Sequence, residues 1–356
     1  MYPALAVVGA LVASNESVEV LWVGGEGGME ASIVQRAGLN YKAIPAAGLH
    51  GVGPLAFPGN LVRMARGIRA SRKILRQFQP EALFFTGGFV GVPVSYAGRH
   101  LPQAIYVPDI EPALALRWIS RWANAIAVTT EESLAYYPED RDVVVAGYPT
   151  RKELVPGPKG PSRHALGLTP DVPTVLVFGG SRGARSINQA LWSCLPGLLL
   201  DMQIVHITGQ LDWPRAEEQL AALEPAQKAR YCPYPYVHDG MANVFSAADL
   251  VVSRAGAAVL GEYPLFGLPA LLVPYPHAWR YQWVNARFLE KHGAAKILKD
   301  EHLEHRLAKQ ILSLMADSRE RERMGAAMHA LHKPEAAKRV AHILNQLPAV
   351  EEAIGG

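Results

Sequence analysis

The sequence contains little cysteine, a modest share of charged residues and no hydrophobic run long enough for a membrane span. Its two cysteines, Cys194 and Cys232, form no CxxC pair and no Cys/His cluster, which excludes a disulfide scaffold and predicts no metal site. Reduced thiols are typical of a cytosolic protein. The apolar start, residues 1–13, lacks a basic region and a cleavage motif. It therefore predicts a buried helix rather than a targeting segment.

The charge total gives no reason to expect nucleic acid as a partner. Lys and Arg number 35 against 32 Asp and Glu, and hydrophobic residues make up 49% of the chain, which also excludes disorder. The distribution is less even, because no acidic residue occurs between Ala31 and Pro80. Within that stretch a helix is expected from about Asn60 to Phe78, with arginines, among them Arg63 and Arg66, outside its apolar stripe. The stripe is Leu61, Met64, Ala65, Ile68, Leu75 and Phe78.

The loop before this helix exposes Leu55 and Phe57. A basic helix next to an apolar loop is typical of a protein that docks on an anionic membrane surface without crossing it. An arginine-rich solvated helix, packed by its apolar stripe, is the alternative interpretation.

Short apolar runs rich in β-branched residues alternate with longer helical stretches along the chain. This alternation is typical of parallel sheets covered on both faces, so we predict a doubly wound α/β protein. The expected strands are Val18–Val23, Ala82–Thr86, Ala104–Val107, Ala125–Thr129, Val143–Ala146, Thr174–Phe178, Gln203–Thr208, Asp249–Ser253 and Ala270–Val273.

The chain is long enough for two domains. A segment rich in Pro, Gly and Lys, from Thr150 to Pro173, carries no strand pattern and predicts a linker. We therefore expect an N-terminal domain at 1–149, a C-terminal domain at 150–330 and a helical tail at 331–356.

Two turns in the C-terminal half have the chemistry of a phosphate or nucleotide site. In the first, a strand ends at Phe178 and a helix follows a turn that contains Ser181, so free backbone N–H groups would converge on one point. In the second, small residues follow a strand at Ser253, and a helix expected to begin near Ala257 would carry Glu262 about one and a half turns in, within reach of ribose hydroxyls. The glycines of the first turn are Gly179, Gly180 and Gly183.

Polar side chains follow the next strand, where ligands of open α/β sheets bind. They are His277, Arg280, Gln282 and Asn285. In the N-terminal half, an expected strand is likewise followed by two glycines, Gly87 and Gly88. After the next strand, Asp109 and Glu111 are candidates for a general base or for binding sugar hydroxyls. Tight turns, solvated helix carboxylates and proline-flanked loops are the alternative explanations.

Seven collinear segments resemble the MurG family of peptidoglycan N-acetylglucosaminyltransferases, within glycosyltransferase family 28. The resemblance runs from the first residues to about residue 300. The segments are YPALAV at Tyr2, AGLHGVGPL at Ala47, TGGFVGVP at Thr86, GYPTRKEL at Gly147, FGGSRGARSINQ at Phe178, SRAGAAVLGEYPLFGLPALLVPYPHAWRYQWVNA at Ser253 and LEKHGAAKIL at Leu289.

The resemblance implies a GT-B architecture, with two Rossmann-like domains and a C-terminal helix that returns to the first. It places the donor, UDP-N-acetylglucosamine, in the C-terminal domain and a polyprenyl-diphosphate-linked acceptor in the N-terminal domain. It further implies that Ser181 and Arg151 contact the diphosphate and that the main chain at Val237 holds uracil. The sugar would be bound by Gln282 with Asn285 nearby. The phosphate, sugar and ribose would be held by Ala257, Ala258, Val259, Leu260, Gly261 and Glu262.

The sequence departs from the family pattern on the acceptor side. The family begins with a strand and a GGTGGH turn ahead of PALA, whereas here Met1 directly precedes Tyr2, so we expect a gap in the first sheet and a start about a dozen residues late. Tyr106 to Asp109 replaces the family's HEQN loop, and Tyr281 stands where a second glutamine is common.

The resemblance thus implies inverting transfer of N-acetylglucosamine to lipid I at the inner face of the cell membrane, without a metal or other cofactor. Three other functions stay open: transfer to another lipid acceptor, epimerisation of the nucleotide sugar, and binding of the nucleotide sugar without catalysis.

Overall fold

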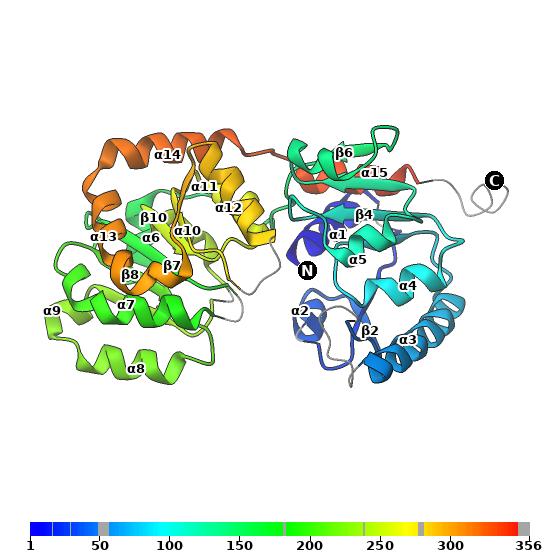
Figure 1. The fold of residues 1–356 in the computed structure, drawn as a ribbon, viewed down its shortest axis with the longest axis horizontal. Helices are drawn as coiled ribbons and strands as arrows, with labels where there is room; N and C mark the ends of the chain where they lie inside the picture. The colour runs from blue at the N-terminus through cyan, green and yellow to red at the C-terminus, as the bar shows by residue number, and fades with distance from the viewer. Residues whose placement is uncertain are drawn as a thin grey trace. The chain divides into compact units, whose positions relative to one another are not determined.

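The protein divides into two compact units, each built on parallel strands (Figure 1). The first contains residues 1–151 and the segment from Lys333 onward, and the second is Lys152–His332. The predicted α/β fold is therefore confirmed. A computed structural model describes residues 1–15, 17–28, 30–48, 57–180, 183–237, 239–276 and 281–347, with only the backbone at position 57.

The strands of the first unit form two separate parallel sheets. β1 (Leu21–Gly25) pairs with β2 (Asn40–Ile44), while the other strands form a sheet in the order β3-β4-β5-β6. Val23 and Ile44 nevertheless share one hydrophobic core with Phe85 of the larger sheet. Among the described strands β1 and β3 do not pair, and the expected missing strand between them stays a prediction. The larger sheet consists of β3 (Leu83–Phe85), β4 (Gln103–Val107), β5 (Ala125–Val128) and β6 (Val143–Val145).

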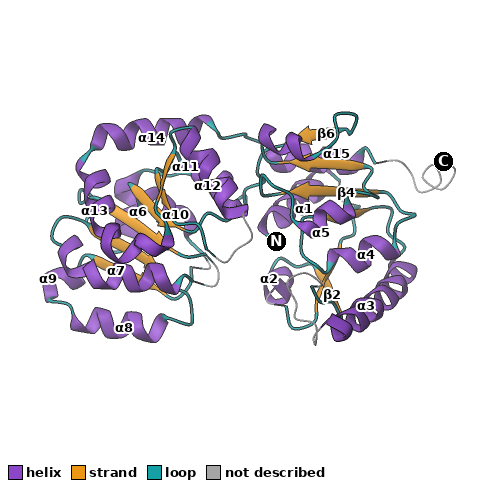
Figure 2. Cartoon of the chain, in the orientation of Figure 1, coloured by secondary structure: helices purple, strands orange, loops and turns teal. Residues whose placement is uncertain are grey.

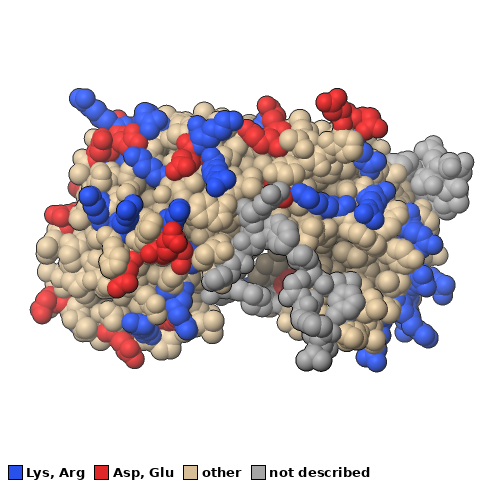
Figure 3. All heavy atoms as spheres, in the orientation of Figure 1, with Lys and Arg blue, Asp and Glu red and all other residues tan. Residues whose placement is uncertain are grey.

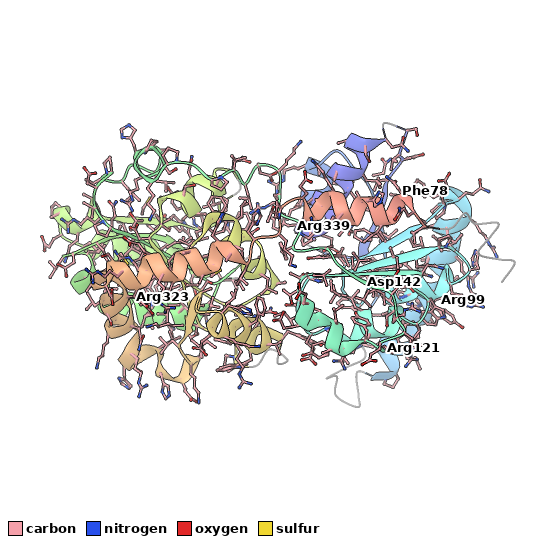
Figure 4. All side chains as sticks on the ribbon, turned by 90° about the horizontal axis from the view of Figure 1, so that it is seen from above. Phe78, Arg99, Arg121, Asp142, Arg323 and Arg339 are labelled. Carbon is pink, nitrogen blue, oxygen red and sulfur yellow. The ribbon has the colours of Figure 1, made fainter. Side chains whose placement is uncertain are left out.

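The first and last described helices of the chain lie side by side in the first unit. α1 (Tyr2–Ser14) packs against α15 (Ala336–Asn345) around the buried side chain of Val7 (Figure 1). Arg339 of α15, labelled in Figure 4, donates from Nε to the carbonyl of Ala146 at 2.9 Å. The N-terminal apolar segment is thus a helix, as predicted, but only Pro3, Ala4 and Val7 of it are buried. The remaining helices of this unit are α2 (Glu30–Arg36), α3 (Phe57–Phe78), α4 (Gly91–Ala97), α5 (Leu114–Ile119) and the 3-10 helix η1 (Glu131–Tyr136).

The second unit has one six-stranded parallel sheet in the order β12-β11-β10-β7-β8-β9 (Figure 2). Its core joins strands and helices through buried residues such as Val175, Leu191 and Leu271. The strands are β7 (Thr174–Phe178), β8 (Gln203–Ile207), β9 (Tyr231–Tyr234), β10 (Leu250–Ser253), β11 (Ala270–Leu272) and β12 (Ala295–Ile297). The helices are α6 (Lys159–Ala165), α7 (Arg185–Leu198), α8 (Trp213–Ala222), α9 (Pro225–Lys228), α10 (Met241–Ala247), η2 (Ala257–Leu260), α11 (Glu262–Phe266), α12 (Tyr281–Lys291), η3 (Asp300–His302), α13 (Leu303–Ala316) and α14 (Ser318–Ala330).

All nine expected strands lie on observed ones, but β2, β9 and β12 were missed. β2 is largely exposed, β9 contains Pro233, and β12 has three residues with Lys296 exposed at its centre. Exposure, proline and short length each remove the continuous apolar signal of a buried strand. Within the described residues, no helix is long and apolar enough to cross a membrane.

Candidate functional site: two turns at the sheet switch point

The two predicted turns of the second unit leave neighbouring strands. β7 pairs with β10, and Phe178 lies opposite Ser253 at the ends of these strands. The order of the sheet reverses between them, because β8 and β9 follow on one side and β11 and β12 on the other. Ligands of open α/β sheets bind at the carboxyl ends of the strands at such a switch point. The structure therefore brings the two turns together where a ligand is expected.

The first turn requires glycine at Gly179 and Gly183, where the backbone packs too closely against other backbone atoms to leave room for a Cβ. A Cβ on Gly183, whose φ is +74°, would lie 2.5 Å from the carbonyl oxygen of Thr208, and one on Gly179 would lie 2.2 Å from the nitrogen of Ala184. Gly180 accepts a hydrogen bond from the Gly183 N–H at 2.9 Å. The 14-residue helix α7 begins directly afterwards, so its unpaired N–H groups face the turn. Ser181 lies outside the described residues, and its diphosphate contact stays a prediction.

The second turn differs from its sequence prediction. The expected helix from Ala257 is a short 3-10 helix that ends at Gly261, whose backbone (φ −136°, ψ −47°) leaves the helical region. α11 then begins at Glu262, so this carboxylate lies at the start of a helix and not one and a half turns into one. Glu262 is only 6% exposed. Its link to ribose hydroxyls stays a prediction.

α12 holds the second turn in place. The Oε1 atom of Gln282 accepts from the backbone N–H groups of Tyr275 at 2.9 Å and Ala255 at 3.3 Å. Asn285 is fully buried and donates from Nδ2 to the carbonyl of Ala255 at 3.1 Å. Because the carbonyl of Gln282 is used on the backbone, a sugar hydroxyl would be bound by its amide nitrogen acting as a donor. His277 and Arg280 lie outside the described residues.

Sequence reasoning missed Arg254, the residue between β10 and the second turn. Its Nη1 atom lies 2.5 Å from Oδ1 of Asp300, and the side chains of these residues are 9% and 21% exposed. The sequence did contain a signal that could have identified this residue, because Arg254 is the one charged side chain within the run of small residues SRAGAA. Buried arginines are rare unless paired, and the partner lies 46 residues away.

The two carboxylates after β4, in the first unit, have different surroundings. Glu111 is 2% exposed and accepts from Nη2 of Arg117 at 3.0 Å. Asp109 is half-buried. Tyr106 is buried, with Oη 2.7 Å from Oγ1 of Thr129, and burial raises the pKa of this phenol far above its ordinary value. The glycines Gly87 and Gly88 form the bend between β3 and α4.

Two further predicted donor residues lie in separate units. Arg151 is the last residue of the first segment of the first unit, and its guanidinium carbon lies 4.3 Å from the ring centroid of Tyr2. Val237 follows β9 in the second unit and is half-buried. Among the described residues, no group of three or more His, Cys, Asp or Glu is placed to hold a metal ion.

The basic face predicted on α3 is present on its described part. Arg63 and Arg66 are exposed, and Lys and Arg side chains line the α3 side of the first unit in Figure 3. The helix ends at Phe78, labelled in Figure 4. The predicted apolar stripe needs a correction, because Leu61 is 52% exposed and Ala65 is exposed as well. Leu55 and the side chain of Phe57 lie outside the described residues.

Comparison with known proteins decides the family. The models of the N-terminal and C-terminal domains of glycosyltransferase family 28 match residues 1–128 and 174–340. The chain belongs to glycosyltransferase family 28. Within this family it is 36% identical to a protein of Roseiflexus sp. and 34% identical to one of Halalkalibacterium halodurans, over 98% and 97% of the chain and 92% and 95% of the relatives. Both are named UDP-N-acetylglucosamine--N-acetylmuramyl-(pentapeptide) pyrophosphoryl-undecaprenol N-acetylglucosamine transferase.

Solved structures agree with the family-28 assignment. MurG of Acinetobacter baumannii superposes with a TM-score of 0.73 at 25% identity, over 97% of this chain and 95% of that one. A UDP-N-acetylglucosamine 2-epimerase of Neisseria meningitidis superposes with a TM-score of 0.66 at 13% identity, a likeness of fold alone. The GT-B architecture and the glycosyltransferase class predicted from the sequence are confirmed.

Proposed function

We propose that this family-28 enzyme transfers N-acetylglucosamine from UDP-N-acetylglucosamine to lipid I, forming lipid II in peptidoglycan synthesis. The observation that carries the proposal is the near full-length similarity to transferases of that name. The position of the two turns at the switch point of the second unit supports a donor site there. Among the described residues, none specifically favours another acceptor or epimerase chemistry.

The reaction is an inverting displacement, in which an acceptor hydroxyl attacks the anomeric carbon and UDP leaves. Negative charge grows on the departing diphosphate, so stabilising that charge is the main task of the protein. Backbone N–H groups at the start of α7, with Ser181 and Arg151, supply positive potential in this proposal. No metal is needed for it, because these groups take the place of a cation on the diphosphate.

A base must accept the proton of the attacking hydroxyl. Asp109 is our candidate, because the buried carboxylate of Glu111 is already ion-paired to Arg117. The Oε1 atom of Glu111 is already engaged by the guanidinium of Arg117 at 3.0 Å. By resemblance, Asp109 also takes the place of the asparagine in the family's HEQN loop, a position that contacts the donor sugar.

The protein acts in this proposal at the cytoplasmic face of the membrane, held there by the basic face of α3. Exposed arginines beside exposed Leu61 and Val62 suit a surface of anionic headgroups with an apolar layer beneath. No nucleic acid partner is proposed.

Radiolabelled transfer tests the function directly. The purified chain is incubated with UDP-N-acetylglucosamine and lipid I, diacylglycerol or no acceptor, with and without EDTA. We expect label in lipid only with lipid I, unaffected by EDTA, and no UDP release without acceptor. A parallel chain carries an added N-terminal strand and GGTGGH turn, because β1 and β3 belong to separate sheets. Transfer to diacylglycerol, or epimerisation without acceptor, would contradict the proposal.

A further inference from the structure

The guanidinium of Arg254 joins four segments of the second unit. Nη1 lies 2.5 Å from Oδ1 of Asp300 and donates to the carbonyl of Val273 at 3.1 Å. Nη2 donates to Oγ of Ser186 at 2.7 Å. The guanidinium carbon lies 5.1 Å from the ring centroid of Tyr275, within cation–π range. The side chain is thus fixed on both edges and on one face.

The partners of Arg254 come from the segments that the donor would touch. Ser186 is the second residue of α7, directly after the glycine turn, and it also donates to Oδ1 of Asp300 at 2.8 Å. Val273 and Tyr275 follow β11 and lead toward α12. Arg254 itself opens the turn that ends at Glu262. All these contacts lie at the carboxyl ends of the strands, where the switch point is.

We propose that Arg254 is a positioning residue, which holds the two turns at the separation that a bound UDP diphosphate requires. The proposal rests on the proposed donor. Arg254 acts through Ser186 and Asp300, because its Nη1 and Nη2 atoms donate to these side chains and to a backbone carbonyl. A lysine carries the charge but not the planar fork, so it cannot reach both partners at once.

The chain contains a matched control for this arrangement. Arg163 is 7% exposed, and its Nη2 lies 2.6 Å from Oδ2 of Asp249. It also donates to the carbonyls of Ala247 and Pro170. This pair lies at the amino end of β10, while Arg254 lies at the carboxyl end of the same strand. Both substitutions remove an ion pair from a partly buried aspartate and lower stability, although Asp249 keeps its contact with Lys159 at 2.6 Å. Only Arg254 is at the donor turns.

A double-mutant cycle tests the proposal with UDP as the probe. Titration calorimetry measures UDP affinity for the wild type, Arg254→Met, Arg254→Lys, Ser186→Ala, Arg254→Met/Ser186→Ala and Arg163→Met. We expect Arg254→Met to raise the Kd for UDP and the KM for UDP-N-acetylglucosamine by about tenfold or more, with kcat reduced less. We expect Ser186→Ala to raise the same Kd and KM by a smaller factor. We expect the double variant to bind UDP no more weakly than Arg254→Met alone, because both substitutions remove the same contact between Arg254 and Ser186.

Several results would overturn the proposal. If the losses of UDP affinity in the two single variants add up in the double variant, Arg254 contacts UDP independently of Ser186. If Arg254→Lys keeps full affinity for UDP, the positive charge alone is sufficient. If Arg163→Met loses as much UDP affinity as Arg254→Met at a similar loss of Tm, the loss of affinity comes from general destabilisation. A wild type that binds UDP but transfers no sugar contradicts the proposed function and leaves this test intact. A wild type that does not bind UDP contradicts both.

Discussion

Arg117 donates from Nη2 to Oε1 of Glu111 at 3.0 Å, and this contact separates the roles of two carboxylates that lie two residues apart. Glu111 is 2% exposed, so the guanidinium compensates a charge that would otherwise be buried alone. Arg117 also donates from Nε to the carbonyl of Pro112, which fixes the loop after β4. Glu111 therefore stabilises the loop, and Asp109 is left as the candidate for chemistry.

Replacing these two carboxylates should give opposite phenotypes. Asp109→Asn should lower kcat by about a hundredfold or more, with little change in Tm, because an amide cannot accept the proton. Glu111→Gln should lower Tm and keep most of the kcat, since it weakens the pairing of a buried carboxylate outside the reaction. Steady-state kinetics and thermal unfolding of both variants provide the check. Full turnover by Asp109→Asn would remove this residue from the base role.

Substitution of Glu262 should affect recognition of the ribose. A buried carboxylate that accepts from both ribose hydroxyls gives a preference for UDP over 2′-deoxy-UDP. Glu262→Gln should reduce that preference by about tenfold, because hydrogen bonds to a charged group are worth about 1.5–3 kcal/mol. Competition binding of the two nucleotides to both proteins measures it. If the two proteins show the same preference, Glu262 does not contact the ribose.

Removing charge from α3 should weaken membrane binding without changing donor binding. Each basic residue near an anionic surface contributes about 1 kcal/mol, so Arg63→Gln/Arg66→Gln should lower affinity for phosphatidylglycerol vesicles by about 30-fold in low salt. The matched control is Arg306→Gln/Lys309→Gln on α13, where both side chains are also exposed. Vesicle sedimentation and UDP calorimetry are the measurements. Equal losses in the two double variants would contradict a specific basic face.

Protonation of His206 should contribute to acid unfolding of the second unit. The ring is fully buried, 2.8 Å from Oη of Tyr231 through Nδ1 and 3.0 Å from Oδ1 of Asn188 through Nε2. The two Asn188 amide hydrogens go to the Thr208 carbonyl and to Asp212. Its Oδ1 must therefore accept, so Nε2 carries the proton and Nδ1 accepts from Tyr231.

Burial lowers the pKa of His206 from 6.5 to about 3. Between these values the unfolded chain binds a proton that the native protein does not, so stability falls by about 1.4 kcal/mol for each unit of falling pH. His206→Gln has no proton to bind in that window. Its urea unfolding free energy should decline less between pH 6.5 and 4.5 than that of the wild type. Parallel declines would show that His206 does not contribute.

The sequence alone determined the α/β architecture and the positions of the two turns that follow β7 and β10. Apolar strands that alternate with helices specify parallel sheets, and a strand that ends in glycines before a helix specifies a turn through local backbone sterics. Such signals lie within a few neighbouring residues. For this reason the turn at Gly179–Gly183 was predicted correctly, while the strand interrupted by Pro233 was not.

Only the tertiary structure decided which side chains work together. Arg254 meets Asp300 across 46 residues, and Ser186 meets the same carboxylate across 114. The start of α11 at Glu262, the pairing of Glu111 with Arg117 and the exposure of Leu61 likewise depend on what packs nearby. Burial and ion pairing are properties of the folded environment, so no local pattern of residues specifies them.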